Sequence, residues 1–140
     1  MKTPCHNLPG ISEIRWIACT ELHPFLVEKS LAGAPISVER AFTNKVSLYG
    51  VSSCITEQED DNNGRREIAT LEFSTLTKVP PMGVAFLVRQ ASGQWYLIGS
   101  REAEPQVAIS YSTGEAAGDP SVDRVTVTFT AIKALLKVAV

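Results

Sequence analysis

Four residues near the start of the chain are of the types that bind zinc: Cys5, His6, Cys19 and His23. The spacing between Cys19 and His23 would suit one half of a tetrahedral site. Cys5 and His6 are adjacent, however, and neighbouring side chains rarely reach the same ion. Because Cys19 lies in an apolar, strand-like run, we interpret it as a small buried hydrophobic side chain. The sequence therefore predicts an ordinary N-terminal arm and a buried thiol, and no metal site.

Oxygen-bearing side chains recur in the acidic run from Glu59 to Gly64. Glu59, Asp61 and Asn63 fall at the first, third and fifth positions of a calcium-loop frame, and Gly64 falls at its sixth position. The twelfth position, which requires a bidentate Glu, is Thr70. We therefore interpret the run as the solvated tip of a hairpin. Its charges either keep the hairpin soluble or contact a neighbouring subunit. The candidate partner-contact residues are Glu59, Asp60, Asp61, Arg65 and Arg66.

No combination of residues suggests an active site. Both histidines lie in the N-terminal quarter, and no Gly-x-Ser-x-Gly elbow could position a serine nucleophile. Glu102 and Glu104 occupy a polar connection without an apolar pocket that would raise a pKa, so we expect solvated charges. Gly93 and Gly99 are isolated and form no phosphate-binding loop. We therefore expect a protein that is not an enzyme and needs no cofactor.

Length and composition favour one globular domain over residues 1–140, with residues 1–10 as a short N-terminal arm. The net charge of −2 provides no basic field for binding nucleic acid. No apolar run has the length of a signal peptide or a membrane span. The three cysteines are an odd number without close spacing, which fits a reducing compartment and predicts a cytoplasmic origin.

The strongest local pattern is an apolar hairpin. Val84–Arg89 and Trp95–Gly99 are rich in β-branched and aromatic residues, and they flank the turn-forming Ala91-Ser92-Gly93. The two runs are too apolar to face water on both sides. They are therefore predicted to lie at the centre of a sheet that other elements cover.

A second, longer hairpin is predicted to carry the acidic tip. Its first strand spans Lys45–Glu57, where Val46 and Ile55 have opposite parity, so a β-bulge at Gly50 would turn both halves toward one core. Its second strand, Arg66–Leu76, places three apolar residues on one side: Ala69, Leu71 and Phe73.

The remaining segments complete a β-rich pattern. Ile11–Cys19 is predicted as the first strand, with Ile14 and Trp16 on one face and Ile17 on the other. Thr20–Gly33 favours a short helix or a structured connection that Gly33 would end. Pro35–Thr43 has the alternation of a strand, with Ile36, Val38 and Arg40 on one face.

In the second half of the chain, Thr77–Met82 is predicted as a linker and Gln106–Ser112 as a strand. Thr113–Ser121 is dense in Gly, Asp and Pro and predicts a loop. Val122–Ala131 alternates between apolar and polar residues, which predicts a strand with one buried and one solvent-exposed face. The apolar run Ala134–Val140 needs a partner, either the domain's own sheet or another subunit.

About eight or nine strands at intervals of roughly 8–12 residues predict an all-β, mainly antiparallel sandwich or barrel. We expect at most one short helix, near residues 25–33. Trp16, Trp95 and Tyr96 raise a functional alternative, a ligand-binding or carbohydrate-binding β-barrel module.

The order of residues from Phe86 to about Leu136 resembles a known group of proteins. It runs Phe86-Leu87-Val88, Gly93-x-Trp95-Tyr96-Leu97-Ile98-Gly99, Pro105, Thr113-Gly114, and a Gly-Asp-Pro loop before a Thr-rich strand. This order is similar to that of small tail-associated proteins from prophages of Bacteroides-type bacteria, with a weaker echo in Gly10-Ile11-x-x-Ile14. The similar positions are packing residues.

The resemblance implies a structural subunit of a phage or prophage tail, without catalytic residues. It implies a β-sandwich or barrel that forms a homo-oligomeric ring or tube and contacts other tail proteins. Such a subunit would be located in the virion tail, and in the host cytoplasm during assembly. Weak net acidity is compatible with a lumen through which DNA passes without binding.

Overall fold

The computed structural model describes residues 2–8, 10–34, 36–38, 43–48, 52–61, 64–76, 78–111 and 122–138. Within these ranges the chain forms strands and two short helical segments: β1 Lys2–Leu8, β2 Ile11–Ala18, the 3₁₀ turn η1 Cys19–Glu21, α1 Leu26–Leu31, β3 Asn44–Val46, β4 Ser53–Asp61, β5 Gly64–Thr75, β6 Val84–Gln90, β7 Trp95–Ile98, β8 Gln106–Tyr111, β9 Asp123–Ala131 and β10 Leu136–Val138. Neither helical segment in these ranges combines the length and apolar character needed to cross a lipid bilayer.

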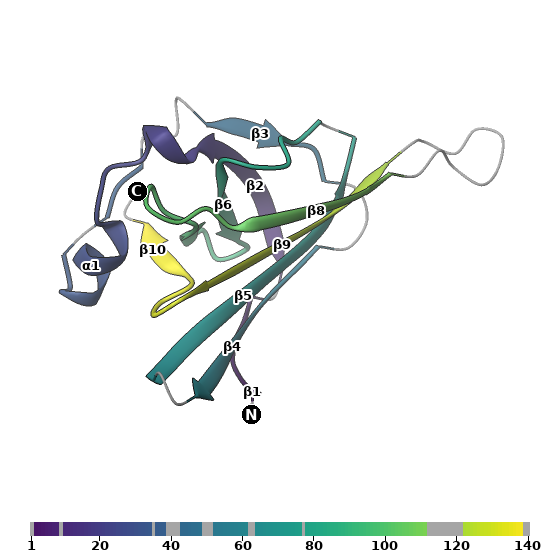
Figure 1. Cartoon of the computed structure of the whole chain (residues 1–140). Coiled ribbons are helices and arrows are strands. Elements are labelled where there is room, and N and C mark those ends of the chain that lie inside the picture. Colours follow the sequence, from purple (N-terminus) through teal and green to yellow (C-terminus); the bar gives the residue numbers. More distant parts are fainter. Residues whose placement is uncertain are drawn as a thin grey trace, which may run out of the picture.

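The strands form two antiparallel sheets of five strands each (Figure 1). We call them sheet A, with strand order β1-β4-β5-β9-β8, and sheet B, with order β10-β7-β6-β2-β3. Neither sheet closes on itself. The predicted all-β antiparallel class is therefore confirmed, and the architecture is a sandwich.

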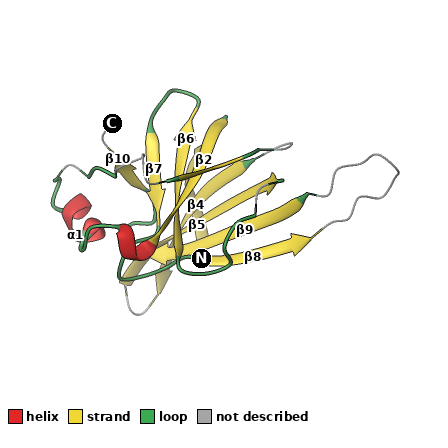
Figure 2. Ribbon diagram, turned by 90° about the horizontal axis from the view of Figure 1, so that it is seen from above, coloured by secondary structure: helices red, strands yellow, loops and turns green. Residues whose placement is uncertain are grey.

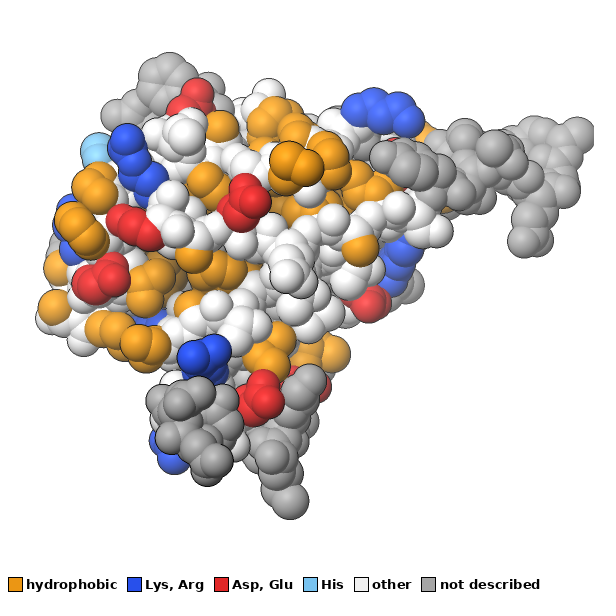
Figure 3. All heavy atoms as spheres, viewed as in Figure 1, with side chains coloured by type: hydrophobic (Ala, Val, Ile, Leu, Met, Phe, Trp, Pro, Cys, Tyr) orange, Lys and Arg blue, Asp and Glu red, His pale blue; other side chains and the backbone are white. Residues whose placement is uncertain are grey.

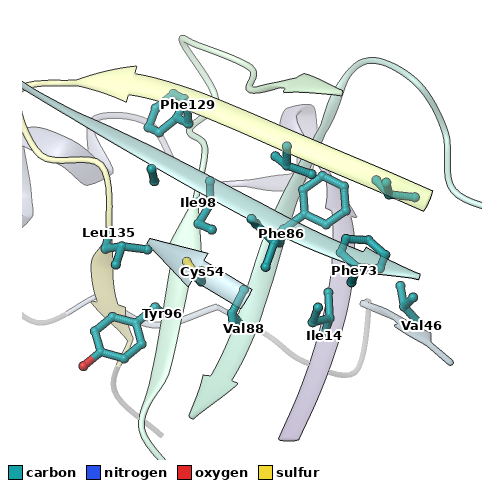
Figure 4. Close-up of a cluster of buried hydrophobic side chains, with 14 of the residues drawn as sticks. Ile14, Val46, Cys54, Phe73, Phe86, Val88, Tyr96, Ile98, Phe129 and Leu135 are labelled. Carbon is teal, nitrogen blue, oxygen red and sulfur yellow. The ribbon is translucent and has the colours of Figure 1, made fainter. Parts of the chain in front are cut away.

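One core fills the space between the two sheets. Strands of sheet A cross those of sheet B at a steep angle, as Figures 2 and 4 show. Phe73 of β5 and Phe86 of β6 meet edge to face at this crossing, with 6.1 Å between ring centroids. Buried side chains from both sheets surround this pair, among them Ile14, Leu71, Val88, Ile98, Val125 and Val127. This packing couples the two sheets into one body.

A second cluster of apolar side chains covers the opposite face of sheet B. Ala85, Leu87 and Leu97 point away from the main core and are fully buried. The segments that follow β2 supply the cover, with Leu22, Leu26 and Ile36 buried in the same cluster. Figure 2 shows α1 at this side of the molecule. Sheet B is therefore packed on both faces.

The central hairpin is confirmed. β6 is the middle strand of sheet B, and β7 pairs beside it. The Gly93 N–H donates to the Gln90 carbonyl over 2.8 Å, and the Gln90 N–H donates to the Gln94 carbonyl over 2.9 Å. Gly93 has a φ of +100°. This positive φ is the reason for a glycine at the end of the predicted turn.

The predicted helix is confirmed as the short α1. Gly33, two residues after α1, has a φ of +80°, as expected for a glycine that ends a helix. The predicted first strand is also confirmed as β2, although Cys19 already belongs to η1. Ile14 and Ile17 lie in the two different clusters, so this strand buries both of its faces as the pattern indicated.

The prediction of one strand over Lys45–Glu57 is wrong. β3 belongs to sheet B and β4 to sheet A, so the chain crosses from one sheet to the other between them. Gly50, where a bulge was predicted, lies outside the described residues. The inward residue of β4 is Cys54, which is fully buried, whereas Ile55 points outward and is 38% exposed.

Three further segments differ from or narrow the predictions. Within Pro35–Thr43, residues 36–38 and 43 are described and form no strand; Ile36 is buried without a ladder partner. The predicted N-terminal arm contains β1, which pairs with β4 at the edge of sheet A. The C-terminal run pairs through β10 with β7, so its partner is the domain's own sheet. The predicted loop Thr113–Ser121 lies outside the described residues.

Candidate assembly interface

The β4–β5 hairpin brings together the five residues predicted as partner contacts. Its register places opposite charges across from each other in two pairs, Glu59 with Arg66 and Asp60 with Arg65. Asp61 is opposite Gly64, whose φ of +113° suits a glycine. The predicted charged tip is therefore confirmed as a feature of the fold, and the predicted contact with a neighbour stays a prediction.

The tip extends beyond the strand that supports it on one side. The last pair between β5 and β9 joins Glu67 with Ala131, so Gly64, Arg65 and Arg66 continue past the end of β9. On the other side, β1 accompanies β4 as far as Glu59. Figure 1 shows this end of the hairpin pointing away from the core.

Ion pairing at the tip is solvated. Arg65 Nε donates to Asp60 Oδ1 over 3.2 Å, and the two side chains are 70% and 68% exposed. Such a pair contributes about 0–1 kcal/mol to folding, because water competes for both groups. These charges are therefore accessible to a second molecule and contribute little to the stability of the hairpin.

The outer face of sheet A is polar. None of the described side chains on the outer faces of β4, β5, β8 and β9 is buried. Thr128 lies between Thr70 and Gln106 in the register, and Thr126 lies between Glu72 and Ala108. The charge of Arg124 on this face is compensated, because its guanidinium donates to Glu72 Oε2 over 3.3 Å and to Ser74 Oγ over 3.1 Å. On the β5, β9 and β8 part of this face, the exposed groups are therefore hydroxyls and the Arg124–Glu72 pair.

A polar cluster at one end of sheet B was not predicted from the sequence. Arg15 Nε donates to Glu13 Oε2 over 3.1 Å, and Lys45 Nζ lies 3.2 Å from Glu13 Oε1. The Arg15 guanidinium also lies 5.9 Å from the centroid of the Trp95 ring. Opposite charges two residues apart on a strand share one face, and this spacing of Glu13 and Arg15 was the available signal.

The pKa of Glu13 reflects its partners. Burial alone would raise the pKa of this carboxyl, but the hydrogen bonds and positive charges of Arg15 and Lys45 outweigh burial. The pKa therefore lies below its usual value of 4.5. The cluster holds a carboxylate that remains ionised in mildly acidic solution.

The residues considered as zinc ligands do not come together in the described part of the structure. Cys19 is buried, and burial together with the nearby Glu104 raises the pKa of its thiol to about 11. His23 is exposed. Among the described residues, no group of three or more His, Cys, Asp and Glu side chains is arranged to hold a metal ion. The side chains of Cys5 and His6 are outside the described part.

Glu102 has a backbone partner that the sequence did not indicate. Its Oε1 accepts a hydrogen bond from the Phe25 N–H over 2.6 Å. Phe25 precedes α1 with a φ of +61°. Residues other than glycine rarely adopt this backbone conformation. Glu102 therefore holds the start of α1 against the connection that follows β7.

No family model, curated protein or solved structure matches this chain. What the β4–β5 tip and the outer face of sheet A can do therefore has to follow from their own exposure, charge and strand geometry.

Proposed function

We propose that this chain is a non-enzymatic structural subunit of a phage or prophage tail that assembles with copies of itself into rings. The observation that carries the proposal is the β4–β5 hairpin, whose solvated charged tip extends past β9. Where β5 continues past β9, it offers both side chains and backbone to a neighbouring subunit. The resemblance of residues 86–136 to tail-associated proteins supports the same class.

The outer face of sheet A supports this proposal by its lack of strong charge. A surface that lines a passage for DNA has to avoid holding phosphate groups. Arg124 on this face is paired with Glu72, and Thr70, Thr126 and Thr128 present hydroxyl groups. In the proposed role the subunit is part of the virion tail and is assembled in the host cytoplasm.

The alternative of a carbohydrate-binding module gains no support from the aromatic residues that suggested it. Trp95 and Tyr96 are only 3% and 7% exposed and belong to the two buried clusters. Trp16 packs against the main core, and its indole nitrogen is buried. A sugar ring stacks on an exposed aromatic face, and these three side chains do not present one.

Electron microscopy of the purified protein, together with light scattering after gel filtration, tests the proposal. We expect rings or short tubes and a mass of several subunits. A protein that stays strictly monomeric at high concentration would contradict it.

A charge exchange tests the role of the tip. The double variant Asp60→Arg, Arg65→Asp keeps an ion pair within the hairpin but inverts the charges that a neighbour meets. We expect this variant to fold normally and to assemble poorly. The matched control exchanges Glu72→Arg and Arg124→Glu, an exposed pair of similar geometry on the outer face, and should assemble like the wild type. Equal assembly of both variants would exclude the tip as a contact.

A further inference from the structure

The four edges of the two sheets differ in how they are protected. In sheet B, the edge strands β3 and β10 span only three residues each. In sheet A, β1 contains Pro4, which has no N–H, and its register shifts between Pro4 and His6. Short strands, prolines and bulges are the devices by which proteins keep edges from pairing with other chains.

β8 has none of these devices. It spans six residues, Gln106–Tyr111, and pairs with β9 in a continuous register without a bulge. Its sequence, QVAISY, contains no charged residue and no proline. Among the described residues, no strand lies on the outer side of β8. No strand within the described ranges pairs with its backbone N–H and C=O groups on that side.

Apolar surface lies beside this open edge. In Figures 1 and 2 the connection before β6, residues 78–83, runs alongside β8. Met82 in this connection is 71% exposed, and Val107 and Ile109 of β8 are only partly buried against the core. Figure 3 shows hydrophobic side chains gathered on this face above β8. A strand added to β8 would remove part of this surface from water.

Strand direction decides how a second copy can be added. Every pair in sheet A is antiparallel, and the sheet has five strands, so β1 and β8 run in the same direction. If both copies keep their core on the same side of the joined sheet, joining β8 to β1 of the next copy creates a parallel pair at a proline-containing edge. Joining β8 to β8 of a second copy about a twofold axis creates an antiparallel pair.

We propose that β8 pairs antiparallel with β8 of a second copy and so joins two copies of sheet A into one continuous sheet. This inference rests on the proposed self-assembly and names the joint at which it begins. A twofold joint also means that larger assemblies contain an even number of subunits.

The side chains of β8 are compatible with pairing to themselves. With the twofold axis at Ala108, Val107 faces Ile109 of the second copy, and Gln106 faces Ser110 of the second copy. Apolar side chains then meet apolar side chains on the inner face, and small or uncharged side chains meet on the outer face. No like charges oppose each other, which is the condition for favourable cross-strand pairs.

A pair of lysine variants tests this joint. The double variant Gln106→Lys, Ala108→Lys places four like charges across the twofold joint. We expect it to raise the dimer dissociation constant about tenfold or more, which corresponds to roughly 1.4 kcal/mol or more. The control is Thr126→Lys, Thr128→Lys, since these residues are the direct cross-strand neighbours of the first two on β9. Sedimentation measures mass, and thermal unfolding confirms that both variants are folded.

Single cysteines at Gln106, Ala108 and Ser110, in a Cys5→Ser background, report the pairing geometry. In a twofold antiparallel pair, residues at the axis have Cα atoms about 4.5–5.5 Å apart, within reach of a disulfide. We expect one position to cross-link far more efficiently than the other two. A parallel joint with β1 would cross-link none of them to itself.

The outcomes separate the two proposals. An oligomer that survives the β8 lysines and forms no β8 cross-link overturns the β8 joint but leaves self-assembly intact. A dimer that depends on β8 but never builds rings or tubes supports the joint and contradicts the tail role. A monomeric wild-type protein contradicts both.

Discussion

Sheets A and B have equal numbers of strands but different surroundings. In the middle strand of sheet B, five consecutive residues are buried, from Val84 to Val88, because the second cluster covers the face that the main core does not. In the middle strand of sheet A, buried and partly exposed residues alternate up to Thr75. Sheet B is therefore the structural scaffold. In sheet A, the residues of the outer face and of the β8 edge are less constrained by packing, so they are the ones that can contact a partner.

The largest expected effect is the loss of a core side chain. Phe86→Ala and Leu87→Ala lie on opposite faces of β6, and we expect each to lower the free energy of unfolding by about 2–5 kcal/mol. In sheet A, Leu71→Ala should cost a similar amount, whereas its neighbour Thr70→Ala should cost less than about 1 kcal/mol. Urea unfolding measures all four variants. A Thr70→Ala variant as unstable as Leu87→Ala would mean that the outer face of sheet A is covered.

A smaller difference is expected between two glycines with the same backbone angle. Gly64 in sheet A and Gly99 after β7 both have a φ of +113°. A Cβ at Gly64 would meet nothing within 4 Å, whereas a Cβ at Gly99 would lie 2.8 Å from the Ala85 Cβ and 2.9 Å from the Pro105 Cδ.

Both alanine variants carry backbone strain of about 1–3 kcal/mol, and Gly99→Ala adds overpacking of about 1–3 kcal/mol. The difference between their melting temperatures measures the cost of the close contacts that a Cβ makes at Gly99, because the backbone strain is common to both variants. Equal destabilisation would show that the packing around Gly99 relaxes without cost.

The smallest expected effect is a loss of stability at low pH through Glu13. Because the pKa of Glu13 is lowered in the folded state, its contribution to stability is complete above the unfolded value near 4.5 and is lost as pH falls through the folded value. Between pH 6 and pH 3, the wild type should therefore lose about 0.5–1 kcal/mol more stability than Glu13→Gln. Identical pH profiles would mean that Arg15 and Lys45 do not hold this carboxylate.

Period-two alternation located β5, β8 and β9, because one face of each packs on the main core. Val125, Val127 and Phe129 in β9 illustrate this: each is buried, and the residues between them are polar. The same rule was misleading between Val46 and Ile55, whose opposite parity predicted a bulge within one strand. Val46 points into the main core from sheet B, whereas Ile55 points outward from sheet A.

Burial without pairing explains the other differences. Ile36 and Val38 pack on the second cluster, although residues 36–38 belong to no described strand, and sequence alternation does not distinguish such a segment from a strand. The charged tip was predictable because its residues are local. The open edge of β8 was not, because the absence of a neighbour depends on the strand order of the whole sheet.

Strand order also sets when each surface finds its partner during synthesis. β2 ends at Ala18, but its central neighbour β6 begins only at Val84. On the ribosome, the side chains of Ile14 and Ile17 therefore stay without their β6 neighbours until Val84 and the residues after it have emerged. During this interval, aggregation or chaperone binding competes most strongly with folding. We expect refolding from urea to take milliseconds to seconds, as stopped-flow fluorescence of the two tryptophans would measure, and microsecond folding would contradict this dependence on distant segments.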